Sequence, residues 1–353
     1  MKQCRLKKVL FGMALVTVGL IGSSPAWADY TFTTFQASPG LSTRGFGLND
    51  KGEVVGIYYD NGTERGFLRS PTGSISFIDT SLGGTRTNTW LESINNSGQI
   101  VGGYLDNGAR VAASYTTSGV MTQYVMPTYP GRTITSSLLD HISNNGDFTG
   151  HYTLNGDTAF RSFYNKGGVH TEFTLPSKTV PGTYLDTQLD YINGNIVAGH
   201  TFGSNTTGFV YDLSKPITQD WQEVAIPGYD ETELERMNVN GDMVGYMSTN
   251  ATNVTRGFVQ YVNGDTWIFP DTLTDVAGTT YTVDNSFVEM INASGVILGY
   301  FDITLPGGAV SQISFLGDPN GGQPVPEPST FLLFGAGIAG LGFLKRRKNL
   351  KSR

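Results

Sequence analysis

One nine-residue pattern recurs six times along this chain of 353 residues, and it constrains the fold more than any other feature. The pattern reads approximately Ile-Asn-x-x-Gly-x-Ile-Val-Gly, and the fourth copy, Ile192 to Ala198, is two residues shorter. A glycine in the middle supplies the positive φ of a tight turn, and the Asn before it can hydrogen-bond to its own backbone. The turn glycines lie 46 to 54 residues apart, at Gly52, Gly98, Gly146, Gly194, Gly241 and Gly295. Self-similarity at this period predicts a repeat architecture.

Each copy of the pattern is followed by segments that read as further strands separated by turns. In the second repeat, the strand Gln99 to Leu105 leads into Asp106-Asn107-Gly108, which is a strong hairpin signal. A third strand follows, as in Gly66-Phe67-Leu68, and then a fourth, as in Met121 to Met126, which tends to end at a proline. Four antiparallel strands at a period near 48 residues predict an all-β, six-bladed β-propeller of four-stranded antiparallel blades over residues 29–318. A pair of β-sandwiches or an open β-solenoid is the alternative.

The sixth repeat has room for only three strands before the Gly/Pro/Asn-rich segment that follows it. A strand-like segment without a repeat of its own, Tyr30 to Phe35, precedes the first pattern. We therefore expect the N-terminal strand to close the ring by pairing beside Gln312 to Leu316, as the outer strand of the last blade. Such pairing would remove a free sheet edge that invites aggregation.

The repeat wording, together with the later Gly-Phe-Leu, resembles the HAF repeat of extracellular bacterial proteins. The resemblance covers most of residues 41–316. It implies a repeat fold and an exported setting, and it brings with it no reaction and no catalytic residue.

The N-terminal 28 residues have the three zones of a secretory signal peptide. A positive start with Lys2 and Arg5 precedes the apolar run Val9 to Ile21, and small residues then lead to Ala28. We expect cleavage after Ala28. A retained membrane anchor is the alternative, but the apolar run is short for a spanning helix.

The C-terminus carries three further elements in a fixed order. A linker and the motif Val325-Pro326-Glu327-Pro328 occupy residues 319–328, and residues 329–353 hold the apolar stretch Phe331 to Leu344 and a basic tail. This order resembles the PEP-CTERM sorting signal, which implies recognition by an exosortase-type processing enzyme through Pro326-Glu327-Pro328. The basic tail would hold its end in the cytoplasm during a transient inner-membrane stage. A plain C-terminal anchor is the alternative.

The exported core is strongly acidic and contains no cysteine. All 30 Asp and Glu residues lie within residues 29–328 against 13 Lys and Arg, which gives a net charge of 13 − 30 = −17. This charge argues against nucleic acid or anionic lipid as a partner and is compatible with divalent cations. Because Cys4 lies in the signal peptide, no disulfide can stabilise the mature fold.

One column of acidic residues runs through five of the six repeats. The acids lie two residues before the apolar residue that opens each pattern, at Glu92, Asp140, Asp190, Glu235 and Glu289, and the first repeat has Phe46 there. In a propeller these positions fall on the innermost strands, so five carboxylates would gather around the central channel. The column is interpretable as a solubility device, as a cation site or acidic mouth, or as a source of a glycosidase-like carboxylate pair. For the cation site we expect weak calcium binding, at roughly 10⁻⁴ to 10⁻³ M.

No motif for catalysis or for a cofactor is found. The four histidines, His141, His151, His170 and His200, lack metal-ligand spacing between neighbours and are interpreted as structural. We expect an exported cell-surface or extracellular-matrix protein that is not an enzyme, and that binds exopolysaccharide or surface proteins. A secreted hydrolase or lyase acting on polysaccharide is the alternative, with Asp271 to Phe287 as the one segment that could hold a lid or pocket.

Overall fold

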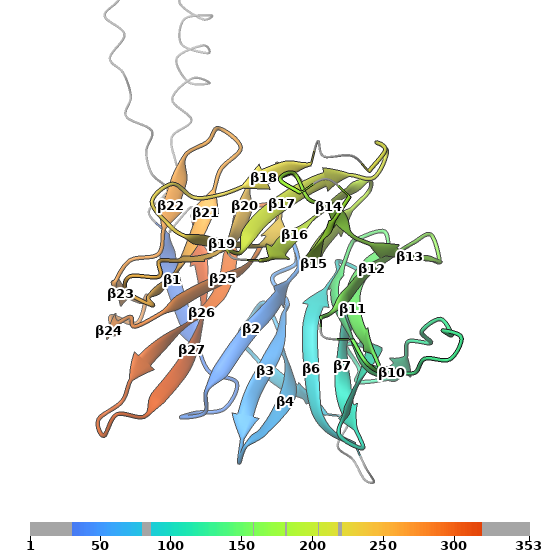
Figure 1. Cartoon of the computed structure of the whole chain (residues 1–353). Coiled ribbons are helices and arrows are strands. Elements are labelled where there is room, and N and C mark those ends of the chain that lie inside the picture. The colour runs from blue at the N-terminus through green and yellow to red at the C-terminus, as the bar shows by residue number, and fades with distance from the viewer. Residues whose placement is uncertain are drawn as a thin grey trace, which may run out of the picture.

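The structure, a computed structural model, describes residues 30–319 except 80–85, 158, 181, 204 and 218–220. The described part of the chain forms six antiparallel sheets arranged around a common axis, as Figure 1 shows, and a separate two-stranded hairpin. Each sheet contains four strands, and one of them has a short fifth strand at its inner edge. The fold is therefore the predicted all-β, six-bladed β-propeller. Among these residues no helix is long and apolar enough to cross a membrane.

The strands of each blade follow one another from the axis to the rim. The innermost strands are β2 (Thr43–Leu48), β6 (Arg86–Ile94), β10 (Ile134–Ile142), β15 (Tyr184–Asn193), β19 (Glu231–Met237) and β25 (Ser286–Ile291). The second strands are β3 (Val54–Asp60), β7 (Gln99–Asp106), β11 (Phe148–Leu154), β16 (Ile196–Phe202), β20 (Met243–Ser248) and β26 (Ile297–Thr304). The third strands are β4 (Thr63–Arg69), β8 (Ala109–Thr116), β12 (Arg161–Lys166), β17 (Thr207–Asp212), β21 (Thr255–Gln260) and β27 (Val310–Asp318). The outer strands are β5 (Ile75–Ile78), β9 (Met121–Gln123), β13 (Val169–Phe173), β18 (Gln222–Val224), β22 (Thr266–Ile268) and β1 (Thr31–Phe35).

The hydrophobic core lies between neighbouring blades rather than inside any one of them. Neighbouring innermost strands contact each other all the way round the ring, including β25 with β2. The residue before each acid of the column is fully buried in these cores, as for Leu91 and Leu189, each 0% exposed. Because no blade can bury its own faces alone, the six repeats stabilise one another by stacking.

Every innermost strand contains a β-bulge at the same place. The extra, unpaired residues are Phe46, Glu92, Asp140, Asp190, Glu235 and Glu289. A bulge redirects the side chain of its extra residue and bends the strand. The acidic column of the sequence is therefore the set of bulged residues.

The bulge explains why the repeated pattern ends in glycine. The glycine lies on the second strand, opposite the residue that precedes the bulge, as in the pair Leu91 and Gly102. A Cβ at Gly102 would lie 2.0 Å from the carbonyl oxygen of Trp90, and in all six blades the corresponding distance is between 1.9 and 2.4 Å. No side chain fits at this distance, so the bulge requires glycine on the facing strand.

Several of the turns that follow the innermost strands are hydrogen-bonded to the turn of the next blade. Asn95 Oδ1 accepts the backbone N–H of Gln99 within its own turn, and its Nδ2 donates to the carbonyl of Ser143 in the next blade. At the junction of the last and first blades, the N–H of Ala293 donates to Asp50 Oδ1 at 2.9 Å. The turn glycines all have positive φ, as predicted.

The N-terminal strand closes the ring as expected. β1 pairs antiparallel with β27, with Thr33 opposite Leu316 and Phe35 opposite Ser314. The segment expected to hide a lid instead forms the hairpin β23 (Thr272–Thr274) and β24 (Thr280–Thr282), which packs against β1. The backbone N–H of Val276 donates to the carbonyl of Phe32 at 2.9 Å, and Thr34 Oγ1 donates to Asp275. The hairpin thus contacts the outer strand of the last blade.

The structure corrects some details of the sequence-based prediction. In the fourth repeat Ile192 pairs with Val197 and Leu189 with Gly199, so that copy is one residue shorter than the others, not two, and its final glycine is Gly199. The fourth strands are shorter than expected. For example, β9 ends at Gln123, whereas the predicted strand continued to Met126. A fifth strand, β14 (Leu175–Pro176), pairs with the start of β15. The signal peptide at residues 1–28, its cleavage site Ala28 and the C-terminal segment from residue 320 lie outside the described residues.

The requirement for glycine opposite the bulge can be tested by mutation. Replacing Gly245 with Ala places a Cβ 1.9 Å from the carbonyl oxygen of Glu233, so either the bulge or the strand pair must shift. We expect Gly245→Ala to lower the free energy of unfolding by at least about 2 kcal/mol, measured by urea denaturation. Gly203→Ala is the matched control, because its nearest neighbour would be 3.7 Å away, and it should change stability by less than about 0.5 kcal/mol. Equal effects of the two substitutions would contradict this account of the motif.

Candidate functional site in the central channel

The five acids of the column come together in the central channel, on the innermost strands of blades 2 to 6. Four of them are buried, at 5% exposure for Asp140, 1% for Asp190, 8% for Glu235 and 9% for Glu289, and Glu92 is partly exposed. Their charges act on one another across blades. The charges of Asp140 and Glu289 raise the pKa of Glu92, and those of Asp190 and Glu289 raise the pKa of Glu235. The acids therefore share one space, as the repeat predicted. Burial of the side chains excludes a role as a surface solubility device for most of the column.

The side chain of Arg236 reaches across this space. Arg236 follows the bulge of β19 in blade 5, and its side chain is 4% exposed. Its Nη2 donates to the backbone carbonyl of Asp140 in blade 3, and its Nη1 donates to the carbonyl of Glu235, both at 2.9 Å. Nη1 also lies 3.6 Å from Glu235 Oε2. A permanent positive charge is thus fixed between two blades amid the carboxylates.

Two histidines pair with acids of their own blades. His151 and His200 each follow the final glycine of the pattern, at a position occupied by Tyr246 and Tyr300 in the last two blades. His151 Nδ1 is hydrogen-bonded to Asp140 Oδ2 at 2.9 Å. His200 Nδ1 lies 3.1 Å from Asp190 Oδ2. Both histidines are buried in the channel wall. We did not predict their position beside the acids, because we interpreted each histidine as an isolated strand residue.

The channel shifts the protonation of its acids in opposite directions. Burial, assisted by the charge of Asp140, raises the pKa of Glu92 to about 8, and burial raises the pKa of Glu289 to about 7. Burial likewise raises the pKa of Glu235 well above its ordinary value. Burial acts in the same direction on Asp190, but the charges of His200 and Arg236 and the hydrogen bond from Gln188 together outweigh it and lower that pKa. At neutral pH the column is therefore a mixture of neutral and ionised carboxyl groups.

A pocket of about 110 Å³ lies at the end of the channel where the six turns meet. Its lining includes Asn49, Asn95 and Asn238 from the turns and His141 from β10. His141 Nδ1 accepts the backbone N–H of Ile192 at 3.2 Å, and burial holds its pKa well below the ordinary value, so this ring is neutral. Binding of calcium by all five acids together stays a prediction.

A second hollow lies at the surface between blades 3 and 4. It has a volume of about 270 Å³, and its lining includes Phe160, Arg161, Glu172 and Asp186. We call this hollow the interblade groove. Phe160 is 43% exposed, and the charged groups beside it offer both donors and acceptors of hydrogen bonds. No repeat motif marks these residues, because they lie on loops and strand ends that differ from blade to blade.

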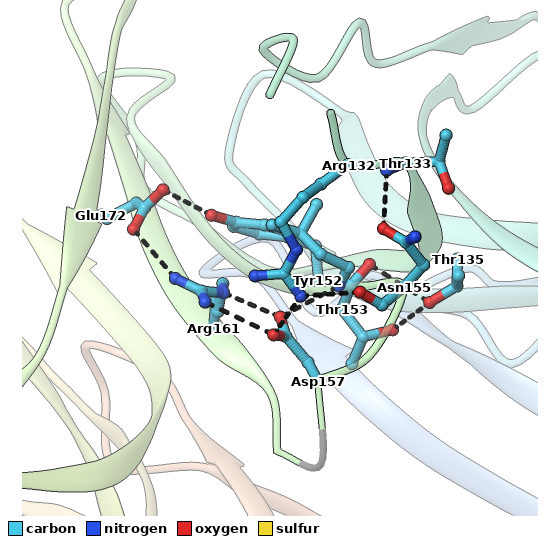
Figure 2. A network of polar contacts seen from close by, with 10 residues as sticks. Arg132, Thr133, Thr135, Tyr152, Thr153, Asn155, Asp157, Arg161 and Glu172 are labelled. Carbon is cyan, nitrogen blue, oxygen red and sulfur yellow. Dashed lines mark hydrogen bonds and ion pairs between the residues drawn. The ribbon is translucent and has the colours of Figure 1, made fainter. Parts of the chain in front are cut away.

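A polar network makes one wall of the interblade groove rigid (Figure 2). Asp157 lies between two arginines and accepts hydrogen bonds from Arg161 Nε at 2.8 Å and from Arg132 Nη2. These two bonds hold the pKa of Asp157 well below its usual range. Glu172 accepts the hydroxyl proton of Tyr152 at 2.5 Å and lies 3.8 Å from Arg161 Nη1. Arg161 and Glu172 are therefore held in place before any ligand arrives.

The C-terminus matches a known sorting signal. Residues 324–348 match the PEP-CTERM protein-sorting motif, which contains Val325-Pro326-Glu327-Pro328 as predicted. This motif implies an exported protein that is sorted to the cell surface and processed by exosortase. The match covers the sorting segment alone, so the resemblance of the repeats to the HAF repeat stays a prediction. The comparison with curated proteins found no match.

Solved structures similar to this chain have very different sequences. One is a protein named as a candidate TolB from Agrobacterium tumefaciens, with 11% identity, a TM-score of 0.47, and coverage of 81% of this chain and 98% of that one. Another is an oligogalacturonate lyase from Vibrio parahaemolyticus, with 12% identity, a TM-score of 0.47, and coverage of 84% of this chain and 97% of that one. At this level of likeness no activity is transferred. What the comparisons add to the propeller is its sorting signal, which marks the chain as an exosortase-sorted surface protein.

Proposed function

We propose that this chain is a cell-surface or extracellular-matrix protein whose propeller is a non-catalytic binding module for polysaccharide or protein, with polysaccharide as the favoured ligand. The sorting motif supports delivery to the surface. The interblade groove is the single observation that carries the choice of ligand. Its residues come from two blades, so a ligand there would contact a rigid, composite surface.

The chemistry of the interblade groove suits a sugar chain. The exposed ring of Phe160 offers a flat apolar face, on which the apolar face of a sugar ring can stack. Glu172 and Asp186 supply carboxylate acceptors for hydroxyl groups, and Arg161 supplies donors. A concave site with an aromatic surface and a few placed polar groups is typical of small-molecule and oligomer binding.

The channel acids support the non-catalytic interpretation. Four of the five acidic residues are less than 10% exposed, and Arg236 crosses the space between them. A polysaccharide chain could not reach them without opening the ring of blades. The alternative of a hydrolase or lyase that uses a pair of these acids would need such an opening.

Ligand binding is tested with the purified protein on a polysaccharide array, followed by titration with the strongest ligand. Phe160→Ala removes the exposed ring of the groove and should weaken binding about fivefold, because stacking on an aromatic ring contributes on the order of 1 kcal/mol. Phe77→Ala is the matched control, because Phe77 is 54% exposed but lies on β5 of the first blade. Incubation should leave the ligand chain length unchanged. Absence of glycan binding, or equal weakening by both substitutions, would refute the proposed groove, and shortened chains would favour the enzyme.

Processing is tested by intact-mass measurement on protein from a host that contains an exosortase. We expect mature protein to lack residues 1–28 and the basic tail Lys345 to Arg353. Changing Pro326, Glu327 and Pro328 together to Ala should leave the tail attached, whereas Pro319→Ala, outside the matched segment, should not. A wild-type mature pool that retains the tail would rule out exosortase processing.

A further inference from the structure

Three side chains from two blades converge at one side of the channel. They are Asp190 on β15, His200 on β16 and Glu235 on β19, and one donor atom from each lies within 4.8 Å of the other two. Their exposures are 1%, 3% and 8%. An imidazole and two carboxylates are thus brought together in a buried place that links blades 4 and 5.

The contact between Asp190 and His200 lacks the geometry of a hydrogen bond. Asp190 Oδ2 and His200 Nδ1 lie 3.1 Å apart, yet both atoms are buried without a hydrogen-bond partner. The equivalent pair in blade 3 behaves differently, because His151 and Asp140 form a hydrogen bond at 2.9 Å. Two donors bound to one ion at about 2.0–2.2 Å lie roughly 3 Å apart, which is the separation found in blade 4.

The surroundings orient these side chains as they do in known metal sites. Gln188 Nε2 donates to the other carboxylate oxygen of Asp190 at 2.9 Å, which leaves Oδ2 directed at the histidine. His200 Nε2 lies 3.8 Å from Glu233 Oε2, and that oxygen accepts the hydroxyl proton of Tyr246 at 2.6 Å. A carboxylate behind a metal-binding histidine fixes the ring orientation and is a common feature of such sites.

We propose that Asp190, His200 and Glu235 bind a divalent transition-metal ion, with Zn²⁺ as the ion that this ligand set suits best. Imidazole nitrogen favours zinc and its neighbours in the first transition series over calcium, and three protein ligands leave a position for water. The ion joins blades 4 and 5 and offsets the negative charge of the channel, where Arg236 contributes one permanent positive charge. This site differs from the calcium site expected from the sequence in its ion and in its use of a histidine. It does not depend on the proposed polysaccharide binding.

The test uses the purified full chain, first dialysed against a chelator. Titration with Zn²⁺ should show one ion bound per chain and a raised melting temperature. Binding of Co²⁺ should give visible absorption bands, because a nitrogen and oxygen ligand set around cobalt absorbs there. Calcium at the same concentration should compete poorly with Zn²⁺.

Two variants and two matched controls locate the ion. His200→Gln and Glu235→Gln should each weaken Zn²⁺ binding at least 100-fold and remove the cobalt bands, in proteins whose circular dichroism remains that of a folded β-protein. His151→Gln and Glu289→Gln change the equivalent histidine of blade 3 and the bulged acid of blade 6, and should keep both signals. If either first variant fails to fold, the other decides the question together with the cobalt spectrum of the unchanged protein. Absence of Zn²⁺ binding by the unchanged chain, or equal losses in variants and controls, would overturn the proposal.

Discussion

The β-bulge in each innermost strand is the constraint on which the rest of the structure depends. It adds one unpaired residue to the strand and brings a backbone carbonyl to within 2.4 Å or less of the place that a Cβ would occupy on the facing strand. Only glycine fits there, which is why the repeated pattern ends in Gly56, Gly102, Gly150, Gly199, Gly245 and Gly299. The residue before the bulge packs into the core between blades, and the bulged residue faces the channel. The bulge thus determines both how the blades pack and which side chains line the central channel.

The channel that results is charged but largely shielded from water. Five blades each deliver one carboxyl group, and burial makes ionisation of several of them unfavourable. Three features offset the cost of ionised carboxyl groups in the channel. They are the protonation of Glu92, the pairing of Asp140 with His151, and the positive charge of Arg236. In blade 4, Asp190 and His200 are not hydrogen-bonded, unlike Asp140 and His151 in blade 3, and a third ligand, Glu235, lies near them. Repetition creates the acidic column, and departures from the repeat give each acid its own surroundings.

Much of the fold could be predicted from the sequence because the repeat is regular. The turn glycines gave the number of blades, and the missing strand of the last repeat gave the pairing of β1 with β27. The residues that break the repeat could not be found in the same way. Arg236 occupies a position held by Gly47, Ser93, His141, Tyr191 and Met290 in other blades, so no column marked it. His200 was hidden by the miscounted fourth copy, whose true register places it beside Asp190. The interblade groove depends on contacts between loops of two blades, and these carry no sequence signal.

The bulges direct carboxyl groups into a shared space where their ionisation is unfavourable, and this effect can be measured. The most direct measurement compares the free energy of unfolding of the unchanged protein and of Glu92→Gln between pH 5 and pH 9. The folded-state pKa of Glu92 is about 8 against an ordinary value of 4.5, so the folded state holds a proton that the unfolded chain releases. The stability that this proton confers is present at low pH and is lost as the pH rises towards 8. We predict that the stability of the unchanged protein, relative to the variant, falls by up to about 1.4 kcal/mol per pH unit across this window and is constant above it. A difference that stays constant from pH 5 to pH 9 would show an ordinary, hydrated carboxylate and would contradict it.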